Sequence, residues 1–164
     1  MQALNRDVLV DKLCERLAVE TAGVTLYEAI IVKMTDENIA SRLKHFMHEE
    51  AKHRDLLTAY LDKIGASDRE TPSARLARLE GQAYLKLTGE ASTPAQLLNI
   101  LVTVELVDEN GWEMLINLAH DLGDEDVMHT FSTALKEEKE HLRGVRGMLA
   151  QQTRQMMQPA NEMT

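Results

Sequence analysis

The sequence predicts an all-α fold built from four long helices, and three observations support this prediction. Strong helix formers, chiefly Ala, Leu, Glu, Lys, Gln and Met, dominate the 164 residues. Only three prolines and eight glycines interrupt them. No stretch alternates Val, Ile or Thr as a half-buried strand would. The length fits a single domain with its own core, which we expect over residues 1–152, followed by a flexible C-terminal tail over 153–164.

The first two helices are expected to form a hairpin. Apolar residues recur with helical spacing over about residues 5–34 and again over about residues 37–64. Thr35 or Asp36 can cap the start of the second helix. Gly65 follows its end, where a left-handed residue commonly stops a helix. Because only a few residues connect the two helices, they should pack as antiparallel neighbours.

A long connection with a short helix follows this hairpin. Pro72 stands directly after Thr71, which is the favoured order at a helix start. An amphipathic stretch covers residues 73–87, and Gly89 is expected to end it. The connection contains about 30 residues, while a 25-residue helix is about 37 Å long. It can therefore cross from one end of a bundle to the other.

The second hairpin begins with another capping signal. Thr93 and Gln96 have the spacing of a capping box, and the helix they start should end near His120. A tight turn with acidic residues over 121–126 leads into a last helix, expected to end near Gln152. The layout is therefore two antiparallel helix hairpins joined by one long crossover.

Each long helix has an apolar stripe that is interrupted near its middle by a carboxylate. The stripes are expected to include Leu13, Leu17, Val24 and Tyr27 on the first long helix, Phe46 on the second, Leu101 on the third and Phe131 on the fourth. On the second and fourth long helices a histidine follows three residues later, on the same face. Four buried carboxylates would repel one another and lose their hydration. Two metal cations would compensate their charge, and a ligand set rich in oxygen with one imidazole per metal suits iron or manganese. The candidate ligands are Glu20, Glu50, His53, Glu105, Glu138 and His141.

A single Glu-x-x-His pair is weak evidence, but two pairs in register on buried stripes are specific. Over about residues 5–150 the pattern resembles the ferritin-like di-iron carboxylate superfamily, nearest to bacterioferritin and rubrerythrin-type proteins. The resemblance implies a ferritin-like four-helix bundle in which two glutamates bridge the metals. It places Glu50 and Glu138 as bridges, Glu20 with His53 at one metal, and Glu105 with His141 at the other.

The resemblance also implies a function. The protein is expected to bind two Fe ions, or Mn, and to act as an oxidase, a ferroxidase or a peroxide-reducing enzyme on O2 or peroxide. Tyr27, seven residues after Glu20, is the candidate catalytic residue or else a core residue. The single cysteine, Cys14, excludes a rubredoxin domain, so any electron donor must be external. Ala51 stands where bacterioferritins carry the haem-binding methionine, so no haem is expected.

A different class of function stays open, namely a non-enzymatic stress-related or structural helical protein with a vestigial or structural metal site. The net charge of −9 argues against nucleic-acid binding. No apolar run is long enough to span a membrane, and we expect a cytoplasmic protein. The resemblance suggests a homodimer.

Several polar residues near the candidate ligands have a simpler interpretation. The histidines His45 and His48 are expected at the surface. A solvated face is expected for Glu49, Glu137 and Glu140. On the third long helix, Glu109 or Glu113 would reach the site only if that helix were rotated. The buried stripe of this helix continues at either Asp108 or Glu109.

Overall fold

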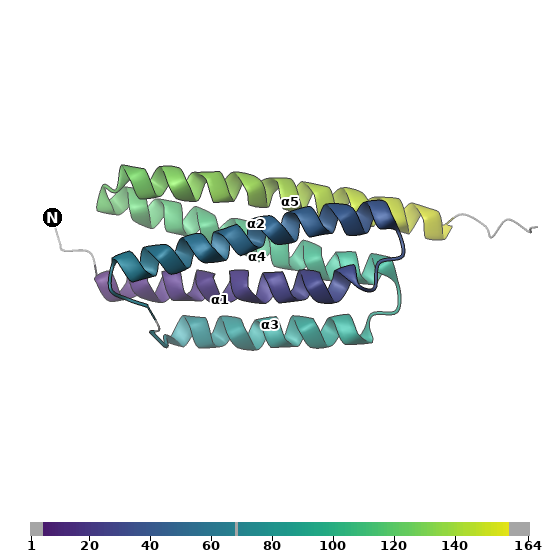
Figure 1. Ribbon diagram of the computed structural model, residues 1–164, viewed down its shortest axis with the longest axis horizontal. Helices are drawn as coiled ribbons and strands as arrows, with labels where there is room; N and C mark the ends of the chain where they lie inside the picture. The colour runs from purple at the N-terminus through teal and green to yellow at the C-terminus, as the bar shows by residue number, and fades with distance from the viewer. Residues whose placement is uncertain (1–4, 68, 158–164) are drawn as a thin grey trace, which may run out of the picture.

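The computed structural model describes residues 5–67 and 69–157, and within these ranges it contains five α-helices and no strand. The all-α prediction is confirmed (Figure 1). The helices are α1 (Arg6–Ile31), α2 (Glu37–Lys63), α3 (Pro72–Glu90), α4 (Pro94–Leu122) and α5 (Glu125–Met157).

The four long helices form a bundle of two antiparallel hairpins, α1 with α2 and α4 with α5 (Figure 1). Helix α1 contacts α2, α3 and α4. The crossover helix α3 packs along the side of α1, outside the four-helix arrangement (Figure 1). Since α1 is covered on several sides, its polar and apolar residues are not divided into two simple faces.

The helix starts follow the predicted capping signals. Asp36, rather than Thr35, caps α2, and its side chain accepts hydrogen bonds from the backbone of the second and third residues after it. Thr71 caps α3 ahead of its proline, and Thr93 with Gln96 forms the full capping box of α4. Gly65 has a φ of 66°, the left-handed conformation expected after α2.

Helix α5 continues beyond its predicted end. We expected it to stop near Gln152, but it reaches Met157. Residues 153–157, which were assigned to the flexible tail, are therefore helical, because no glycine or proline interrupts them. The rest of the predicted tail, residues 158–164, lies outside the described residues.

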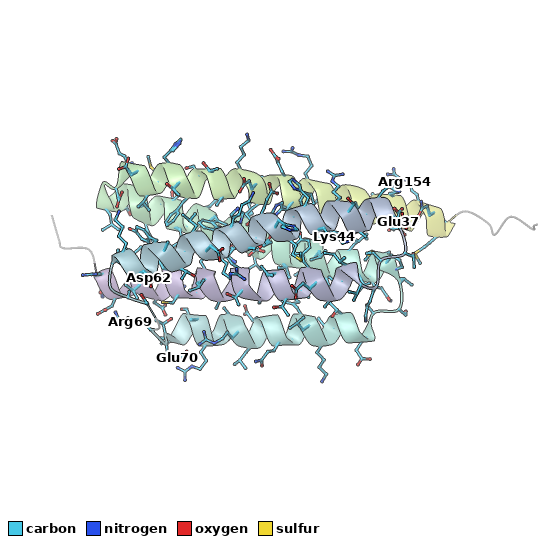
Figure 2. All side chains as sticks on the ribbon, in the orientation of Figure 1. Glu37, Lys44, Asp62, Arg69, Glu70 and Arg154 are labelled. Atoms are coloured by element: carbon cyan, nitrogen blue, oxygen red, sulfur yellow. The ribbon has the colours of Figure 1, made fainter. Side chains whose placement is uncertain are left out.

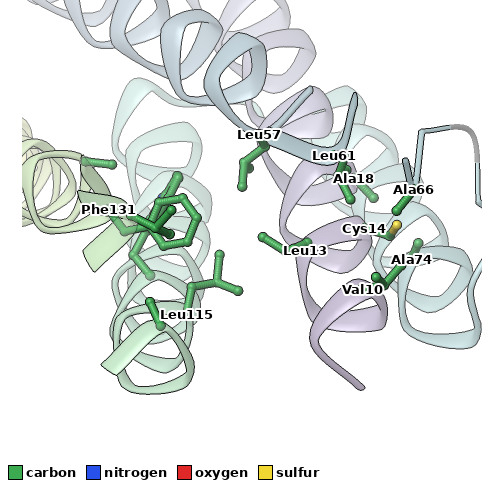
Figure 3. Close-up of a cluster of buried hydrophobic side chains, with 14 of the residues drawn as sticks. Val10, Leu13, Cys14, Ala18, Leu57, Leu61, Ala66, Ala74, Leu115 and Phe131 are labelled. Atoms are coloured by element: carbon green, nitrogen blue, oxygen red, sulfur yellow. The ribbon is translucent and has the colours of Figure 1, made fainter. Parts of the chain in front are cut away.

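The core consists of two apolar clusters with a polar layer between them. One cluster, partly shown in Figure 3, gathers Leu13, Leu57, Leu115 and Phe131 near one end of the bundle. The other includes Tyr27, Ile30, Leu43, Leu98 and Val145 toward the opposite end. The polar layer between these clusters is where the predicted ligands lie.

The buried stripe of α1 differs from its prediction. Leu17 and Val24 were expected inside, but they are half-buried, whereas Arg16 and Gly23 are buried. The reason is that α3 covers the outer side of α1, so apolar residues there also contact protein. The predicted stripe is therefore confirmed at Leu13, Glu20 and Tyr27 and is wrong by one position at Leu17 and Val24.

Charged side chains cover the outside of the molecule. Figure 2 labels six exposed ones, namely Glu37, Lys44, Asp62, Arg69, Glu70 and Arg154. Within the described part of the chain, none of the helices combines the length and hydropathy that crossing a membrane requires.

Candidate metal centre

The six predicted ligand residues meet in the polar layer at the middle of the bundle. Helix α1 supplies Glu20 and α4 supplies Glu105, each as a single glutamate. Helices α2 and α5 each supply a glutamate and a histidine three residues apart, which places both on one helix face. All six are at most 2% exposed. They are Glu20, Glu50, His53, Glu105, Glu138 and His141.

These side chains form two overlapping groups of potential ligands. One group contains Glu20, His53 and the two glutamates Glu50 and Glu138; the other contains Glu105, His141 and the same two glutamates. Within each group, one ligand atom per residue lies within 4.8 Å of all the others. Glu50 and Glu138 therefore have the position that a ligand shared between two neighbouring metal ions requires.

Both histidines direct Nδ1 toward the carboxylates. His53 Nδ1 lies 2.7 Å from Glu138 Oε1 and 3.6 Å from Glu20 Oε2. His141 Nδ1 lies 3.2 Å from Glu50 Oε1, 3.4 Å from Glu138 Oε2 and 3.6 Å from Glu105 Oε2. Each imidazole thus offers the nitrogen that could bind a metal to the interior of the cluster.

The outer nitrogen of each histidine donates to a further glutamate. His53 Nε2 lies 2.7 Å from Glu137 Oε2, and His141 Nε2 lies 2.9 Å from Glu49 Oε2. These side chains are 31% and 15% exposed, so the prediction of a merely solvated face was wrong for both. Glu140 is exposed as expected. A hydrogen bond of this kind fixes the ring orientation and makes the inner nitrogen a better ligand.

The sequence carried a signal for these two glutamates. Each stands directly before a ligand glutamate, so that α2 and α5 both contain Glu-Glu-x-x-His, at 49–53 and 137–141. Neighbouring residues on a helix point in directions about 100° apart, so Glu49 and Glu137 leave the inner stripe of their own helix. They instead reach the histidine of the facing helix.

Glu20 is held by a hydrogen bond and an ion pair that the sequence analysis did not predict. Trp112 Nε1 donates to Glu20 Oε1 at 2.9 Å, and Arg16 Nε lies 3.1 Å from the same oxygen. The buried Arg16 also pairs with Asp108. A Cβ at Gly111 would collide with Arg16 Nη1, so glycine makes room for the guanidinium. The available signal was the spacing of Arg16 four residues before Glu20, on the same helix face.

Tyr27 lies beside the second group of ligands. Its hydroxyl donates to Glu105 Oε1, which leaves Glu105 Oε2 facing the cluster. Burial and the neighbouring Glu105 carboxylate raise the pKa of Tyr27 well above its ordinary value. Tyr27 therefore keeps its proton.

The alternative ligands on α4 stay outside the site. Asp108, not Glu109, continues the buried stripe. Glu109 and Glu113 lie 3.9 Å and 3.0 Å from the Lys139 ammonium near the surface. His45 and His48 are exposed, as expected.

The cluster contains more buried carboxylates than cationic groups that could neutralise them, and this shifts the pKa values of its residues. Burial, and after it the nearby Glu138, raises the pKa of both Glu50 and Glu105 well above the ordinary value. Burial alone would lower the pKa of the histidines, but the carboxylates outweigh it and raise the pKa of His53 to about 11 and of His141 to about 10. The two histidines in turn outweigh the effect of burial on Glu138 and lower its pKa to about 2.

The unpartnered polar atoms show what the cluster lacks. Within the described residues, the buried side-chain nitrogens and oxygens that have no hydrogen-bond partner are all in or beside this cluster. They include the inward oxygens of Glu20, Glu50, Glu105 and Glu138. Buried oxygens without a donor are costly, and metal cations are the partners that carboxylate and imidazole ligands of this type accept. The residues present therefore fit a pair of metal ions.

Comparisons with known proteins place the chain in a family without assigning it a function. The model of the family DUF892, described as a domain of unknown function, matches residues 5–158. Among solved structures, the chain is similar to "YcfI, a putative structural protein from Rhodopseudomonas palustris", with 18% identity and a TM-score of 0.74. That match covers 89% of this chain and 96% of the other, and at this identity it concerns the fold alone. The comparison with curated proteins found no match.

Proposed function

The chain belongs to the DUF892 family, and we propose that its bundle is ferritin-like and holds two iron or manganese ions that react with dioxygen or peroxide. The observation that carries this proposal is the convergence of four carboxylates, each with at least one unpartnered oxygen, and two imidazole Nδ1 atoms in one buried layer. When ionised, these carboxylates carry the charge that balances two divalent cations. Arg16 and Asp108 neutralise each other beside them.

The proposed roles of the ligands follow from the two overlapping groups. Glu20 Oε2 and His53 Nδ1 would hold one ion, and Glu105 Oε2 and His141 Nδ1 the other. Glu50 and Glu138 would bind both ions. Glutamate and histidine ligands suit iron and manganese, so both metals are included in the proposal.

Other residues keep these ligands in position. Trp112 and Arg16 hold Glu20 Oε1, and Tyr27 holds Glu105 Oε1, so each terminal glutamate has its second oxygen free for a metal. Glu137 and Glu49 orient the two histidines. Complete burial of the ligands also excludes bulk water from the reacting atoms.

A bound pair of ferrous ions would supply two electrons, enough to reduce one dioxygen to hydrogen peroxide or one hydrogen peroxide to two waters, with two protons taken up. Tyr27, whose hydroxyl donates a hydrogen bond to Glu105, is the candidate catalytic residue in our proposal. The chain has one cysteine, too few for a redox-active disulfide within the chain. An external donor would therefore return the electrons if the reaction is catalytic.

The test is to count bound metal and then to follow its oxidation. Wild type and the exposed-site control Glu140→Ala should bind about two Fe²⁺ or Mn²⁺ per chain anaerobically, as expected for a dinuclear site. Glu50→Ala and Glu138→Ala should lose both ions, because each removes a shared ligand. Stopped-flow mixing of the ferrous protein with O2 or with peroxide then identifies the preferred oxidant.

Two results would argue against the proposal. If wild type binds no metal stoichiometrically, the metal centre is absent and the proposal fails. If two ions bind but neither O2 nor peroxide oxidises them faster than free Fe²⁺, the site is structural. That second result would favour the non-enzymatic alternative.

A further inference from the structure

A small apolar cavity lies where α3 covers the groove between α1 and α4. Its walls come from all three helices, and its one charged lining residue, Glu80, is exposed. Val107, also in the lining, is 41% exposed, so the cavity is close to solvent on that side. Other wall residues are Ala22 and Gly23 from α1, Gly81 and Tyr84 from α3, and Val104 from α4.

Gly23 connects this cavity to the ligand cluster. It lines the cavity, and it also faces the shared ligand Glu50: a Cβ added at Gly23 would lie 3.0 Å from Glu50 Oε2 and 3.6 Å from Glu50 Cδ. Glu50 Oε2 is buried and has no hydrogen-bond partner. Because residue 23 is glycine, no side chain separates the cavity from Glu50 of the candidate metal centre at this point.

The crossover helix is what encloses the cavity. Gly81 of α3 packs so closely on α1 that a Cβ there would lie 2.6 Å from Ala22 Cβ. Without α3, the apolar groove between α1 and α4 would be open to solvent on this side. The helix thus turns a surface groove into a chamber beside Glu50.

The size and the chemistry of the cavity restrict its ligand. It leaves about 20 Å³ for the centre of a water-sized molecule, which is room for one such molecule. Among its lining residues only Tyr84 and the exposed Glu80 have a hydrogen-bonding side chain, so a cation or a strongly hydrated anion would lose most of its hydration without compensation. A small, neutral, apolar molecule fits these walls best.

We propose that this cavity is the site through which dioxygen reaches the metal centre, entering beneath α3 and passing Gly23 to Glu50. This inference rests on the proposed function, because dioxygen has a role only if the centre binds a reducing metal pair. It adds a role for α3, which supplies no ligand. It also assigns a purpose to a buried glycine in the middle of α1, where glycine lowers helix stability.

The first test uses xenon, an apolar probe, and needs no metal. Crystals of the metal-free protein pressurised with xenon should show an anomalous peak in the cavity. In Val104→Phe, whose larger side chain fills the space, the peak should be lost. Val104→Ile adds a single methylene and should reduce the peak with little effect on folding. An empty wild-type cavity under xenon would overturn the proposal.

The second test measures the rate at which the ferrous protein reacts with dioxygen. Both Val104 variants should bind metal as wild type does, and should react with dioxygen several-fold more slowly, with the larger effect for Phe. Leu106→Phe is the matched control, because Leu106 lies on α4 but is 45% exposed and outside the cavity. Unchanged rates in both Val104 variants would overturn the proposal, whereas absence of bound metal in wild type would overturn the proposed function instead.

Discussion

Glu50 and Glu138 are the residues on which the proposed centre most depends, because each belongs to both groups of ligands. Their surroundings differ in a way that follows from the neighbouring side chains. Glu138 forms ion-pair contacts with the Nδ1 atoms of both histidines, at 2.7 Å and 3.4 Å, whereas Glu50 forms one with His141 Nδ1, at 3.2 Å. In the metal-free protein the histidines therefore stabilise charge on Glu138, and burial disfavours charge on Glu50.

The two glutamates that orient the histidines, Glu49 and Glu137, should affect metal affinity without binding metal themselves. Glu137→Ala removes the acceptor of His53 Nε2 and should weaken metal binding at the Glu20 and His53 position by about 10- to 100-fold. Glu140→Ala changes a nearby exposed residue and should have no effect. Anaerobic titration with Mn²⁺, followed by calorimetry, compares them. Equal affinities in the two variants would show that the hydrogen bond to Glu137 has no such role.

The protonation of the histidines predicts how metal binding depends on pH. The carboxylates raise the pKa of His53 to about 11 and of His141 to about 10 despite burial, so both are protonated at neutral pH when no metal is bound. Each must release a proton before Nδ1 can bind a metal. Metal affinity should therefore rise with pH through the neutral range. Calorimetry in buffers with different ionisation enthalpies should detect release of about two protons or more per metal pair, and a pH-independent affinity without release would contradict this prediction.

At the scale of the helices, the site arises from four segments that place polar residues at one level. Regular spacing made this predictable from sequence: on α2, α4 and α5, the expected stripe residues Phe46, Leu101 and Phe131 are all buried. Helix α1 was less predictable because α3 covers it, and no residue pattern within α1 indicates that a later helix packs on it. Spacing within one helix marks Arg16, Glu49 and Glu137, but it cannot identify their partners, which lie on other helices.

The packing of α3 on α1 can be tested with two glycines of the same helix. A Cβ at Gly81 would lie 2.6 Å from Ala22 Cβ, whereas nothing lies within 4 Å of a Cβ at Gly89. Gly81→Ala should therefore destabilise the protein by about 1–3 kcal/mol through overpacking, although alanine is the better helix former. Gly89→Ala should be neutral or slightly stabilising. Urea unfolding measures both, and a Gly81→Ala variant as stable as wild type would show that α3 is free to move away from α1.

At the scale of the whole molecule, the polar layer interrupts what would otherwise be one continuous apolar core. The clusters on its two sides account for most of the buried apolar side chains, while the layer itself contains buried carboxylate oxygens without hydrogen-bond partners. Buried charge of this kind is usually neutral or unfavourable for stability. The fold therefore maintains a layer that stabilises the protein only when cations occupy it.

Because the polar layer is unfavourable without cations, Glu50→Gln should affect the stability of the metal-free and the metal-bound protein differently. Burial raises the pKa of Glu50 well above its ordinary value, so its charged form disfavours the fold at neutral pH. Glu50→Gln removes that charge, and the metal-free variant should be at least as stable as metal-free wild type. At free Mn²⁺ of 100 times the dissociation constant, wild type should gain about 2.7 kcal/mol per bound ion, and Glu50→Gln should gain little. Thermal unfolding with and without Mn²⁺ measures this, and equal stabilisation of both proteins would contradict it.

The most direct test of the central claim is anomalous diffraction from crystals of the protein grown or soaked with Mn²⁺. We expect two peaks inside the bundle, one beside Glu20 Oε2 and His53 Nδ1 and the other beside Glu105 Oε2 and His141 Nδ1. Glu50 and Glu138 should contact both ions. An interior without anomalous density, or manganese bound only to surface carboxylates, would show that the bundle holds no such metal centre.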